Sequence, residues 1–261
     1  MRHIQPLVYH RVCPDSESFS STYVVRQSDF RRQMEYLLSH GYRAVGLDDF
    51  LVPGSGNGTA TGGRVLITFD DGYEDNYTYA FPILREYNIP ALIFLVADFS
   101  RRTNWWDVPL GTPEVPLLTP DQIVRMAGQG VEFGSHTLTH RSLPGLDDGQ
   151  MHAEVAGSRT MIHQVTGVAP RSFSYPYSHV DQRTKDALRN AGYVCAFAVN
   201  GGPYRPAQDP WEIRRVNVTA DAHGLRFGAK LSGAEKLGLW AWWRIRNATG
   251  RGTPLEIRRG F

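Results

Sequence analysis

The sequence predicts an α/β fold in which parallel strands are covered by helices, either as a barrel or as an open sheet. Short runs of apolar and β-branched residues alternate along the chain with segments in which apolar residues recur every three or four positions. The length of 261 residues suits a single barrel domain. A hydrophobic fraction of 41% and a charged fraction of 21% are ordinary for a globular chain and exclude a disordered or fibrous one.

The expected strands are short, and a helix or a loop separates each from the next. RVLITF is continuous in apolar and β-branched residues, as in a strand buried on both faces. Phe30, Met34 and Leu37 recur at helical spacing after Ser28. We expect strands at 4–10, 42–45, 64–69, 91–96, 131–133, 172–175, 194–199 and 213–218. Helices are expected at 28–40, 47–52, 80–87, 119–130, 147–165 and 182–191, and a glycine-rich surface loop at 53–63.

Composition excludes several classes of protein. No apolar run approaches the roughly 20 residues that a membrane-spanning helix needs. The two cysteines, Cys13 and Cys195, are too few for a disulfide framework and are not spaced as in a zinc ribbon. A net charge of +2 argues against nucleic acid as the main partner. The first 12 residues contain no apolar core of the length that a secretory signal needs, which favours a cytoplasmic location.

The end of the chain differs from the rest. The alternation of strands and helices stops near residue 220, so we divide the chain into a domain of residues 1–220 and a basic, aromatic tail of residues 221–261. The tail places Trp242 and Trp243 beside Arg244. Tryptophan next to arginine suits peripheral contact with a membrane or a surface on which sugars stack. A terminal helix that packs its aromatic residues on the barrel explains the pattern equally well.

Two adjacent carboxylates follow the strand expected at 64–69. Asp70 and Asp71 are succeeded by Gly72, which frees the backbone to turn both carboxylates toward one site. Two buried carboxylates side by side are unfavourable unless a cation or a shared proton neutralises one of them. The pair therefore indicates a metal site or a proton-sharing pair, although an acidic turn or a helix N-cap can have the same sequence.

Two histidines follow the strand expected at 131–133. His136 and His140 are four residues apart, the spacing that puts two imidazoles on one face of a helix within reach of one metal ion. A pair at this spacing arises often by chance in a chain with nine histidines. Together with the Asp70–Asp71 pair, however, it supplies the two histidines and one carboxylate that hold a catalytic divalent metal.

These motifs resemble those of a known family. TFDDGY, SHTLTH and FSYPY, in this order, are similar to the first three motifs of the polysaccharide deacetylases, which share the NodB homology domain and form carbohydrate esterase family four. The resemblance covers roughly residues 5 to 220. It implies a distorted (β/α)7 barrel and the metal-dependent removal of N-acetyl groups from a sugar polymer.

The resemblance also implies roles for single residues. Asp71, His136 and His140 would bind the metal, and Asp70 would be the general base. The backbone N–H of Tyr177 would stabilise the oxyanion. Zinc is the first choice of metal for such ligands, and Co²⁺, Ni²⁺ and Fe²⁺ also suit them. Within the same third motif, the resemblance implies that two further residues bind substrate, namely Tyr175 and Pro176.

One family motif is displaced in this chain. The usual final motif, an apolar strand that ends in a general-acid histidine, is missing from the C-terminal part, where His223 lacks the apolar run. PLVYHRV at the N-terminus fits it instead and is similar to a subset that includes exopolysaccharide deacetylases of the poly-N-acetylglucosamine type. We therefore expect His10 to be the general acid, with a hydrogen-bonded histidine at a strand end as the alternative. Ser178 stands where the third motif usually has glycine.

Two further positions are expected near the site. The family pairs an arginine with the base aspartate, and Arg215, in IRRVNV, fits that role better than its competitor Arg171. Trp211 is expected to line the acetyl pocket, unless it is a core tryptophan.

The sequence thus predicts a metal-dependent hydrolase that deacetylates an amino-sugar polysaccharide or its precursor, such as an exopolysaccharide or a cell-envelope glycan. One alternative is an amidase or imidase of the same fold that acts on a small molecule, which would need an enclosed pocket. The other is a non-catalytic glycan-binding protein, against which the complete set of motif residues argues.

Overall fold

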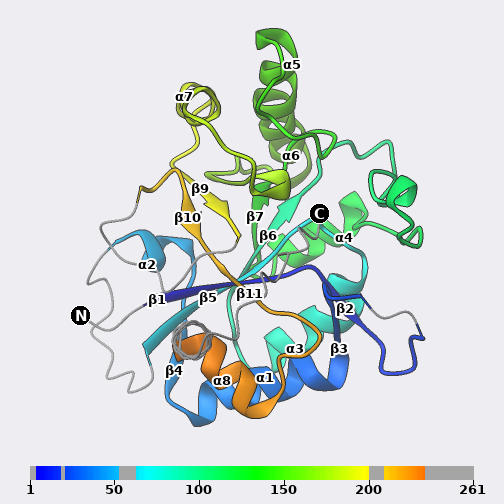
Figure 1. Ribbon diagram of the computed structural model, residues 1–261, viewed down its shortest axis with the longest axis vertical. Helices are drawn as coiled ribbons and strands as arrows, with labels where there is room; N and C mark the ends of the chain where they lie inside the picture. Colours follow the sequence, from blue (N-terminus) through cyan, green and yellow to red (C-terminus); the bar gives the residue numbers. More distant parts are fainter. Residues whose placement is uncertain (1–3, 19–20, 53–62, 200–208, 233–261) are drawn as a thin grey trace, which may run out of the picture.

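The strands form a parallel sheet that curves almost into a closed barrel (Figure 1). The computed structural model describes residues 4–18, 21–52, 63–199 and 209–232. Neighbouring strands follow the order β10-β9-β8-β7-β6-β5-β1-β11, and β4 pairs with β5 beside this path. Their bounds are β1 Ile4–Tyr9, β4 Tyr42–Ala44, β5 Gly63–Phe69, β6 Ala91–Leu95, β7 Glu132–Ser135, β8 Ser172–Ser174, β9 Cys195–Ala198, β10 Ile213–Arg214 and β11 Val216–Asn217.

A last strand, broken in two, links the two edges of the sheet. Its first half, β10, pairs with β9, and its second half, β11, pairs with β1, with Arg215 at the break between them. If β10 and β11 count as one strand, the described chain has seven positions around the barrel, the others being β1, β5, β6, β7, β8 and β9. This confirms the expected (β/α)7 architecture, and it corrects the single continuous strand expected at 213–218.

Helices cover the outside of this sheet (Figure 1), with α1, α3 and α8 on one side and α5, α6 and α7 on the opposite side. Their bounds are α1 Gln27–Ser39, α2 Leu47–Leu51, α3 Phe81–Glu86, α4 Pro120–Ala127, α5 Asp148–His152, α6 Ser158–Thr166, α7 Gln182–Asn190 and α8 Gly224–Ser232. Short turns of π-helix, η1 Asn76–Ala80 and η3 Ala153–Gly157, precede α3 and α6, and 3-10 turns occur at η2 Val108–Leu110 and η4 Pro176–Ser178.

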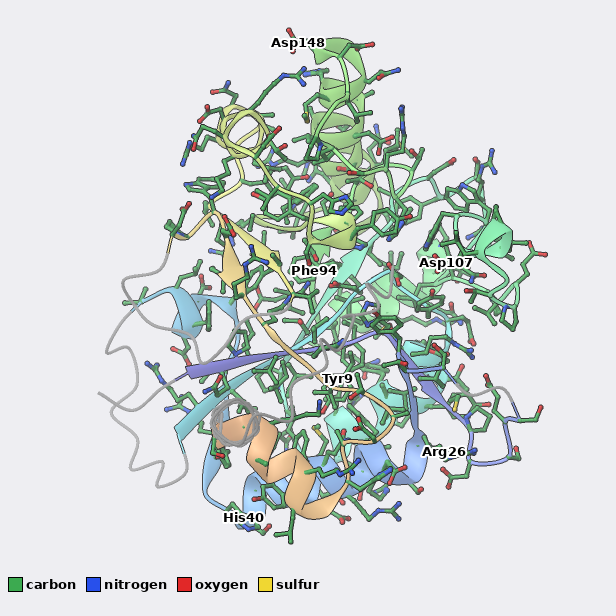
Figure 2. All side chains as sticks on the ribbon, in the orientation of Figure 1. Tyr9, Arg26, His40, Phe94, Asp107 and Asp148 are labelled. Atoms are coloured by element: carbon green, nitrogen blue, oxygen red, sulfur yellow. The ribbon has the colours of Figure 1, made fainter. Side chains whose placement is uncertain are left out.

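Both faces of β5 are buried, which explains its continuous apolar sequence. Ile67 and Phe69 face the helices and belong to the large apolar cluster that α1 and α3 complete. Leu66 faces the opposite way and packs with Phe94 and Phe197 in a second cluster. Because side chains alternate along a strand, this burial on two faces needs apolar residues at consecutive positions. Figure 2 shows Tyr9 and Phe94 near the centre of the fold, whereas Asp148 lies at its edge.

The structure contains a small sheet that the sequence does not predict. β2 Arg11–Cys13 pairs in parallel with β3 Val24–Arg26, just after β1. Strands of three residues are too short for an alternation of apolar and polar positions to be recognised. His10 is the single residue between β1 and β2, so it lies where the chain passes from the barrel sheet to this small sheet.

The first part of the predicted tail packs on the domain. Phe227 and Leu231 of α8 are buried in the cluster that also contains Phe30 and Met34 of α1. The boundary at residue 220 stays a prediction. The tryptophans and arginines after Lys236 lie outside the described residues, as does nearly all of the glycine-rich segment 53–63.

In the described part of the chain, none of the helices combines the length and the apolar character that crossing a membrane requires.

Candidate active site

The predicted site residues follow the carboxyl ends of parallel strands. Asp70 comes directly after β5, His136 after β7 and His10 after β1. Tyr9 pairs in register with Phe69, and the N–H of Asp70 donates to the carbonyl of Tyr9 at 3.0 Å. His10 and Asp70 therefore leave adjacent strands at the same level. In a barrel, residues after the carboxyl ends of the strands meet at one mouth, where active sites form.

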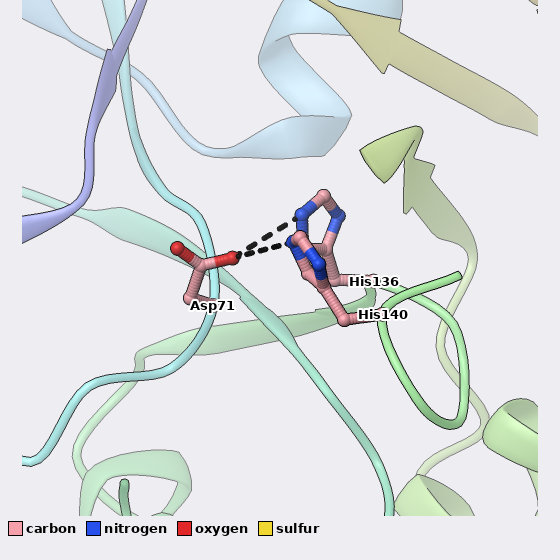
Figure 3. Close-up of side chains that lie close together, drawn as sticks. All are labelled: Asp71, His136 and His140. Carbon is pink, nitrogen blue, oxygen red and sulfur yellow. Dashed lines mark ion pairs between the residues drawn. The ribbon is translucent and has the colours of Figure 1, made fainter. Parts of the chain in front are cut away.

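Three buried side chains converge at this mouth (Figure 3). The Nε2 atoms of His136 and His140 lie 3.3 and 3.2 Å from the same oxygen of Asp71, Oδ1. The ligand atoms lie within 4.8 Å of one another, and all three residues are buried. Burial alone would raise the pKa of Asp71, but the two neighbouring histidines hold it well below its ordinary value. An ionised carboxylate thus faces two imidazole nitrogens.

These donors fit a divalent metal ion. Asp71 Oδ1 is buried and has no hydrogen-bond partner among the described residues. His136 Nδ1 lies 2.7 Å from the carbonyl of Ser174, and because a carbonyl only accepts, the proton of this imidazole sits on Nδ1. The lone pair of Nε2 then points toward Asp71. A second partner that fixes the tautomer in this way is typical of histidines that bind metals.

The two histidines lie on a loop, not on a helix. The helical arrangement suggested by their spacing is wrong, because Thr137 and His140 adopt left-handed backbone conformations with φ of 68° and 62°. Glu154 of η3 holds this loop. Its buried carboxylate accepts the backbone N–H groups of Leu138 and Thr139, each at 2.9 Å, and the hydroxyl of Thr139. One acidic side chain therefore supports the backbone between both candidate ligands.

Replacing Glu154 with glutamine is expected to weaken zinc binding by about 10- to 100-fold, the range typical for residues that orient metal ligands. The amide keeps the size of the side chain but loses the charge that attracts both backbone N–H groups. Equilibrium dialysis with zinc measures the effect, and Asp147→Asn, at the exposed N-cap of α5 nearby, is the control. Unchanged zinc affinity in the glutamine variant would show that the loop holds its shape without Glu154.

Asp70 forms a buried ion pair with Arg215. Each carboxylate oxygen accepts from one guanidinium nitrogen at 2.7 Å, and Ser174 donates to Oδ2 at 3.1 Å. Burial raises the pKa of Asp70, but Arg215, His136 and His10 together outweigh it and hold the pKa below its ordinary value. The expected contact of Arg215 with Asp70 is thus confirmed. Its competitor Arg171 lies one residue before β8, at the amino end of the strand, and instead pairs with Asp48 at 2.7 Å.

His10 lies near these groups. Burial lowers the pKa of its imidazole, and the charges of Asp71 and Asp70 act on it in the opposite direction. Its ring contacts Tyr23, with 4.8 Å between the ring centres. The displaced N-terminal motif thus brings a histidine to the mouth that holds the metal ligands. His223, in contrast, lies 3.1 Å from Asp29, at the start of α8.

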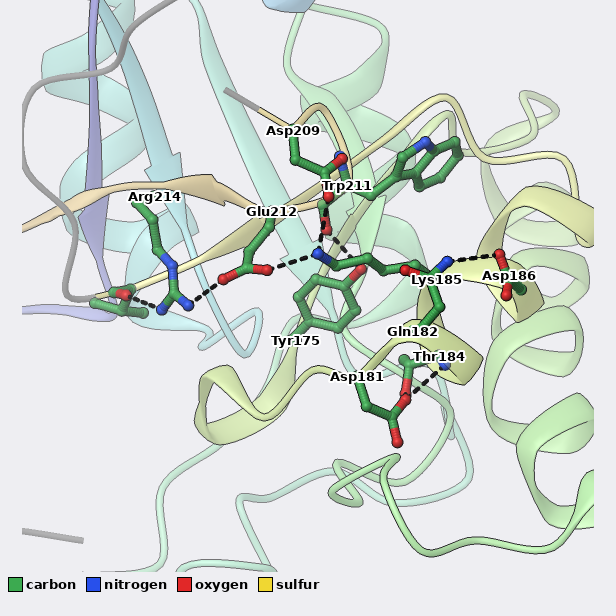
Figure 4. Close-up of polar contacts among 11 residues, drawn as sticks. Tyr175, Asp181, Gln182, Thr184, Lys185, Asp186, Asp209, Trp211, Glu212 and Arg214 are labelled. Atoms are coloured by element: carbon green, nitrogen blue, oxygen red, sulfur yellow. Dashed lines mark hydrogen bonds and ion pairs between the residues drawn. The ribbon is translucent and has the colours of Figure 1, made fainter. Parts of the chain in front are cut away.

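The third motif contributes one side chain to the site and directs another away from it. The hydroxyl of Tyr177 lies 3.1 Å from His140 Nδ1, and Pro176 starts the 3-10 turn that positions it. Tyr175 points to the outside of the barrel, where its hydroxyl donates to the carbonyl of Trp211 (Figure 4).

The structure does not bring Trp211 to the metal ligands. It packs on the apolar cluster under α7, with the guanidinium of Arg189 5.0 Å from the centre of its ring. The interpretation as a tryptophan packed on the core therefore describes it better than a place in the acetyl pocket.

The sequence model of the family described as polysaccharide deacetylase matches residues 57–196, more than half of the chain. The chain belongs to the polysaccharide deacetylase family. It is thereby classed with hydrolases that act on carbon–nitrogen bonds, as the motif resemblance implies.

Individual relatives extend this likeness over most of the chain. YxkH of Bacillus subtilis, provisionally named a polysaccharide deacetylase, is 29% identical over 227 residues, which are 85% of this chain and 74% of YxkH. The poly-beta-1,6-N-acetyl-D-glucosamine N-deacetylase of Staphylococcus epidermidis is 27% identical over 209 residues, 77% of this chain and 70% of that protein. The solved structure of IcaB from Ammonifex degensii is 26% identical, with a TM-score of 0.71, and the match covers 88% of this chain and 97% of IcaB.

The deacetylase site also contains residues that the sequence analysis missed. Trp106 stacks on His140 at 4.6 Å between ring centres and 16° between ring planes. Burial raises the pKa of Asp107, the charge of Asp71 adds to this effect, and Tyr73 donates to its carboxylate at 3.3 Å. Two adjacent tryptophans followed by an aspartate, in a long segment between a strand and a helix, were a signal that could have been used.

The zinc affinity of the metal-free protein is expected to rise with pH through the pKa of His136. Burial alone would lower that pKa, but Asp71 and Asp70 raise it above the ordinary histidine value. Below this pKa the imidazole carries a second proton and has no lone pair for a metal, so protons compete with zinc. Competition against a chromophoric chelator between about pH 5.5 and 8.5 measures the dependence. An affinity that does not change over this range would contradict the prediction.

Proposed function

We propose that this protein is a metal-dependent deacetylase that hydrolyses N-acetyl groups of an amino-sugar polysaccharide or its precursor, an exopolysaccharide or a cell-envelope glycan. The observation that carries the proposal is the meeting of the Asp71–His136–His140 cluster with the Asp70–Arg215 pair at one mouth of the barrel. The names of relatives such as the poly-beta-1,6-N-acetyl-D-glucosamine N-deacetylase of Staphylococcus epidermidis support a glycan of this class as substrate.

Asp71, His136 and His140 would hold the metal, for which zinc is the first choice and Co²⁺, Ni²⁺ and Fe²⁺ also suit the ligands. When bound there, the ion supplies Lewis acidity at the acetyl carbonyl. The protein supplies the fixed orientation of the ligands: Ser174 sets the tautomer of His136, and Tyr177 contacts the outer nitrogen of His140.

Asp70 accepts the proton of the attacking water in this proposal. Its charge is maintained by Arg215, whose guanidinium holds both carboxylate oxygens in place. The water oxygen bonds to the acetyl carbon, and the carbon–nitrogen bond then breaks. His10 gives its proton to the departing nitrogen, which leaves as the free amine while acetate is released. The backbone N–H of Tyr177 would stabilise the negative charge on the acetyl oxygen.

Acetate release from N-acetylglucosamine oligomers tests the proposal. The assay compares β-1,6-linked and β-1,4-linked oligomers, before and after treatment with a chelator, and again after zinc is restored. Acetate release that disappears with the chelator and returns with zinc is expected. Hydrolysis of small amides or cyclic imides alone would favour the amidase alternative, and binding of oligomers without any hydrolysis would favour a glycan-binding protein.

A further inference from the structure

Two buried residues, Asp75 before η1 and Asn76 at its start, hold the chain at His10 and at the two residues that follow it. Asn76 donates from Nδ2 to the carbonyl oxygen of His10 at 2.8 Å. Asp75 accepts the backbone N–H of Val12 at 3.3 Å and the Nε–H of Arg11 at 2.7 Å. The three consecutive residues from His10 to Val12 are therefore fixed by two consecutive residues that lie 63 to 66 positions further along the chain.

These contacts form one network. Nδ2 of Asn76 also donates to Asp75 at 3.1 Å, which fixes the orientation of the amide, since both of its acceptors are oxygens. Arg11 extends the network to Glu17, whose two carboxylate oxygens accept at 2.9 and 3.2 Å. Asp75 and Asn76 are both buried. A buried polar network of this kind holds the backbone that it contacts in one position.

The side chain of Asp75 does not cap its own helix, η1. It occupies the N-cap position of η1, where an aspartate side chain commonly accepts the backbone N–H groups of the first turn. The carboxylate makes no such capping bond and is directed to β2 instead. Its contacts are therefore explained by the position of β2, and not by the start of the helix.

The imidazole of His10 has little else to hold it among the described residues. Its Nδ1 is buried there without a hydrogen-bond partner, and its ring contacts Tyr23, which is 43% exposed. No carboxylate or carbonyl orients the ring in the described part of the chain, so the position of the ring depends on the backbone that carries it. A general acid must lie within hydrogen-bond reach of the leaving group.

We propose that Asp75 and Asn76 are positioning residues that hold His10 against the metal cluster. The inference rests on the proposed function, in which His10 is the general acid. The turn from Asp70 to Asn76 then has three tasks: it carries the general base, it supplies the metal ligand Asp71, and it fixes the backbone of the acid. Acid and base are thereby held in one geometry by a single segment.

A double-mutant cycle with His10 tests this inference. Asn76→Ala is expected to lower kcat on an N-acetylated oligomer by about 10- to 100-fold, the order of loss that misplacing a reacting group causes. KM and zinc affinity are expected to stay within about twofold, because neither substrate nor metal contacts are removed. In the His10→Ala background, the same substitution is expected to change kcat by less than about twofold, since there is no acid left to misplace.

Two further variants make the test specific. Asn76→Asp keeps the shape of the side chain but cannot donate to the carbonyl of His10, so it should behave like Asn76→Ala. Asp181→Ala, which removes a carboxylate that holds the Thr184 N–H at 2.8 Å on α7, measures the effect of losing a helix cap away from the site and should leave kcat unchanged. Thermal unfolding of every variant confirms that the measured protein is folded.

The outcomes separate the inference from the function on which it rests. Equal losses from Asn76→Ala with and without His10, or a loss of zinc affinity as large as the loss of kcat, would overturn the positioning role. A normal kcat in Asn76→Asp would overturn it as well. A His10→Ala variant with wild-type kcat would instead remove the general-acid assignment of the proposed function.

Discussion

Asp70→Asn is expected to lower kcat for deacetylation by about 10³-fold, within the range seen when a general base is removed. The amide cannot accept the proton of the attacking water, whereas its oxygen and nitrogen still fill the space beside Arg215. Zinc affinity should fall little, because Asp71, not Asp70, faces the two histidines. Acetate release at saturating substrate, together with a zinc titration of the same sample, gives both values.

Asparagine is the informative replacement because of the buried ion pair. Both Asp70→Asn and Asp70→Ala remove the charge that pairs with the buried guanidinium of Arg215, and breaking a buried pair costs about 3–5 kcal/mol. The amide oxygen of asparagine still accepts one guanidinium N–H, whereas alanine leaves no acceptor at this position. A loss of activity in the alanine variant could then be a loss of folded protein. Asp48→Asn is the matched control, since it alters an aspartate–arginine pair, with Arg171, that is exposed and distant from the site. Substantial deacetylation by Asp70→Asn would contradict the role of Asp70 as base.

The arrangement of the site could largely be predicted because of the way parallel strands end. Strands buried on both faces have continuous apolar sequences, so the end of β5 could be read from the sequence, whereas β7 extends two residues beyond the strand expected at 131–133. Asp70, Asp71 and His136 follow such ends, and in a barrel these ends share one mouth. The convergence of the ligands thus follows from the strand pattern and the motif resemblance together.

The conformation of the histidine loop could not be predicted from spacing. Histidines four apart satisfy a helix, but the loop depends on the carboxylate of Glu154, which is 14 residues beyond His140. A contact of this kind leaves no periodicity in the sequence. The same limit applies to Asn76, whose partner His10 lies 66 positions earlier.

The direction of Tyr175 was missed for a different reason. Along β8 and the residue after it, Ser172 and Ser174 alternate with Phe173 and Tyr175, and the rule that apolar residues face the core gives no direction when both faces are buried. Here the serines face inward, where Ser174 contacts Asp70, and the aromatic residues face the helices outside. Motif membership alone therefore does not assign a side chain to the site.

His10→Ala is expected to lower kcat for N-acetyl substrates by about 10²- to 10³-fold and to have a much smaller effect on an activated aryl acetate. An amine leaves only after it has received a proton, whereas a nitrophenolate leaves as the anion and needs no acid. Asp70→Asn should slow both substrates, because both require the attack of water. The comparison of the two variants on the two substrates therefore assigns acid and base separately.

His223→Ala is the matched control for this experiment. His223 lies in the C-terminal part of the chain, where the family usually has its acid. It stands just before α8 and pairs with Asp29 of α1, so its replacement should change the hydrolysis of neither substrate. Equal losses on amide and aryl ester in His10→Ala would mean that His10 acts before the leaving group departs, for example by placing the substrate. Selective loss on the amide would mean that the N-terminal strand β1 supplies the proton donor. The register of β1 beside β5 allows this role, because Tyr9 pairs with Phe69 and the next residue, His10, therefore lies at the level of Asp70. This level does not depend on whether the strand comes first or last in the chain.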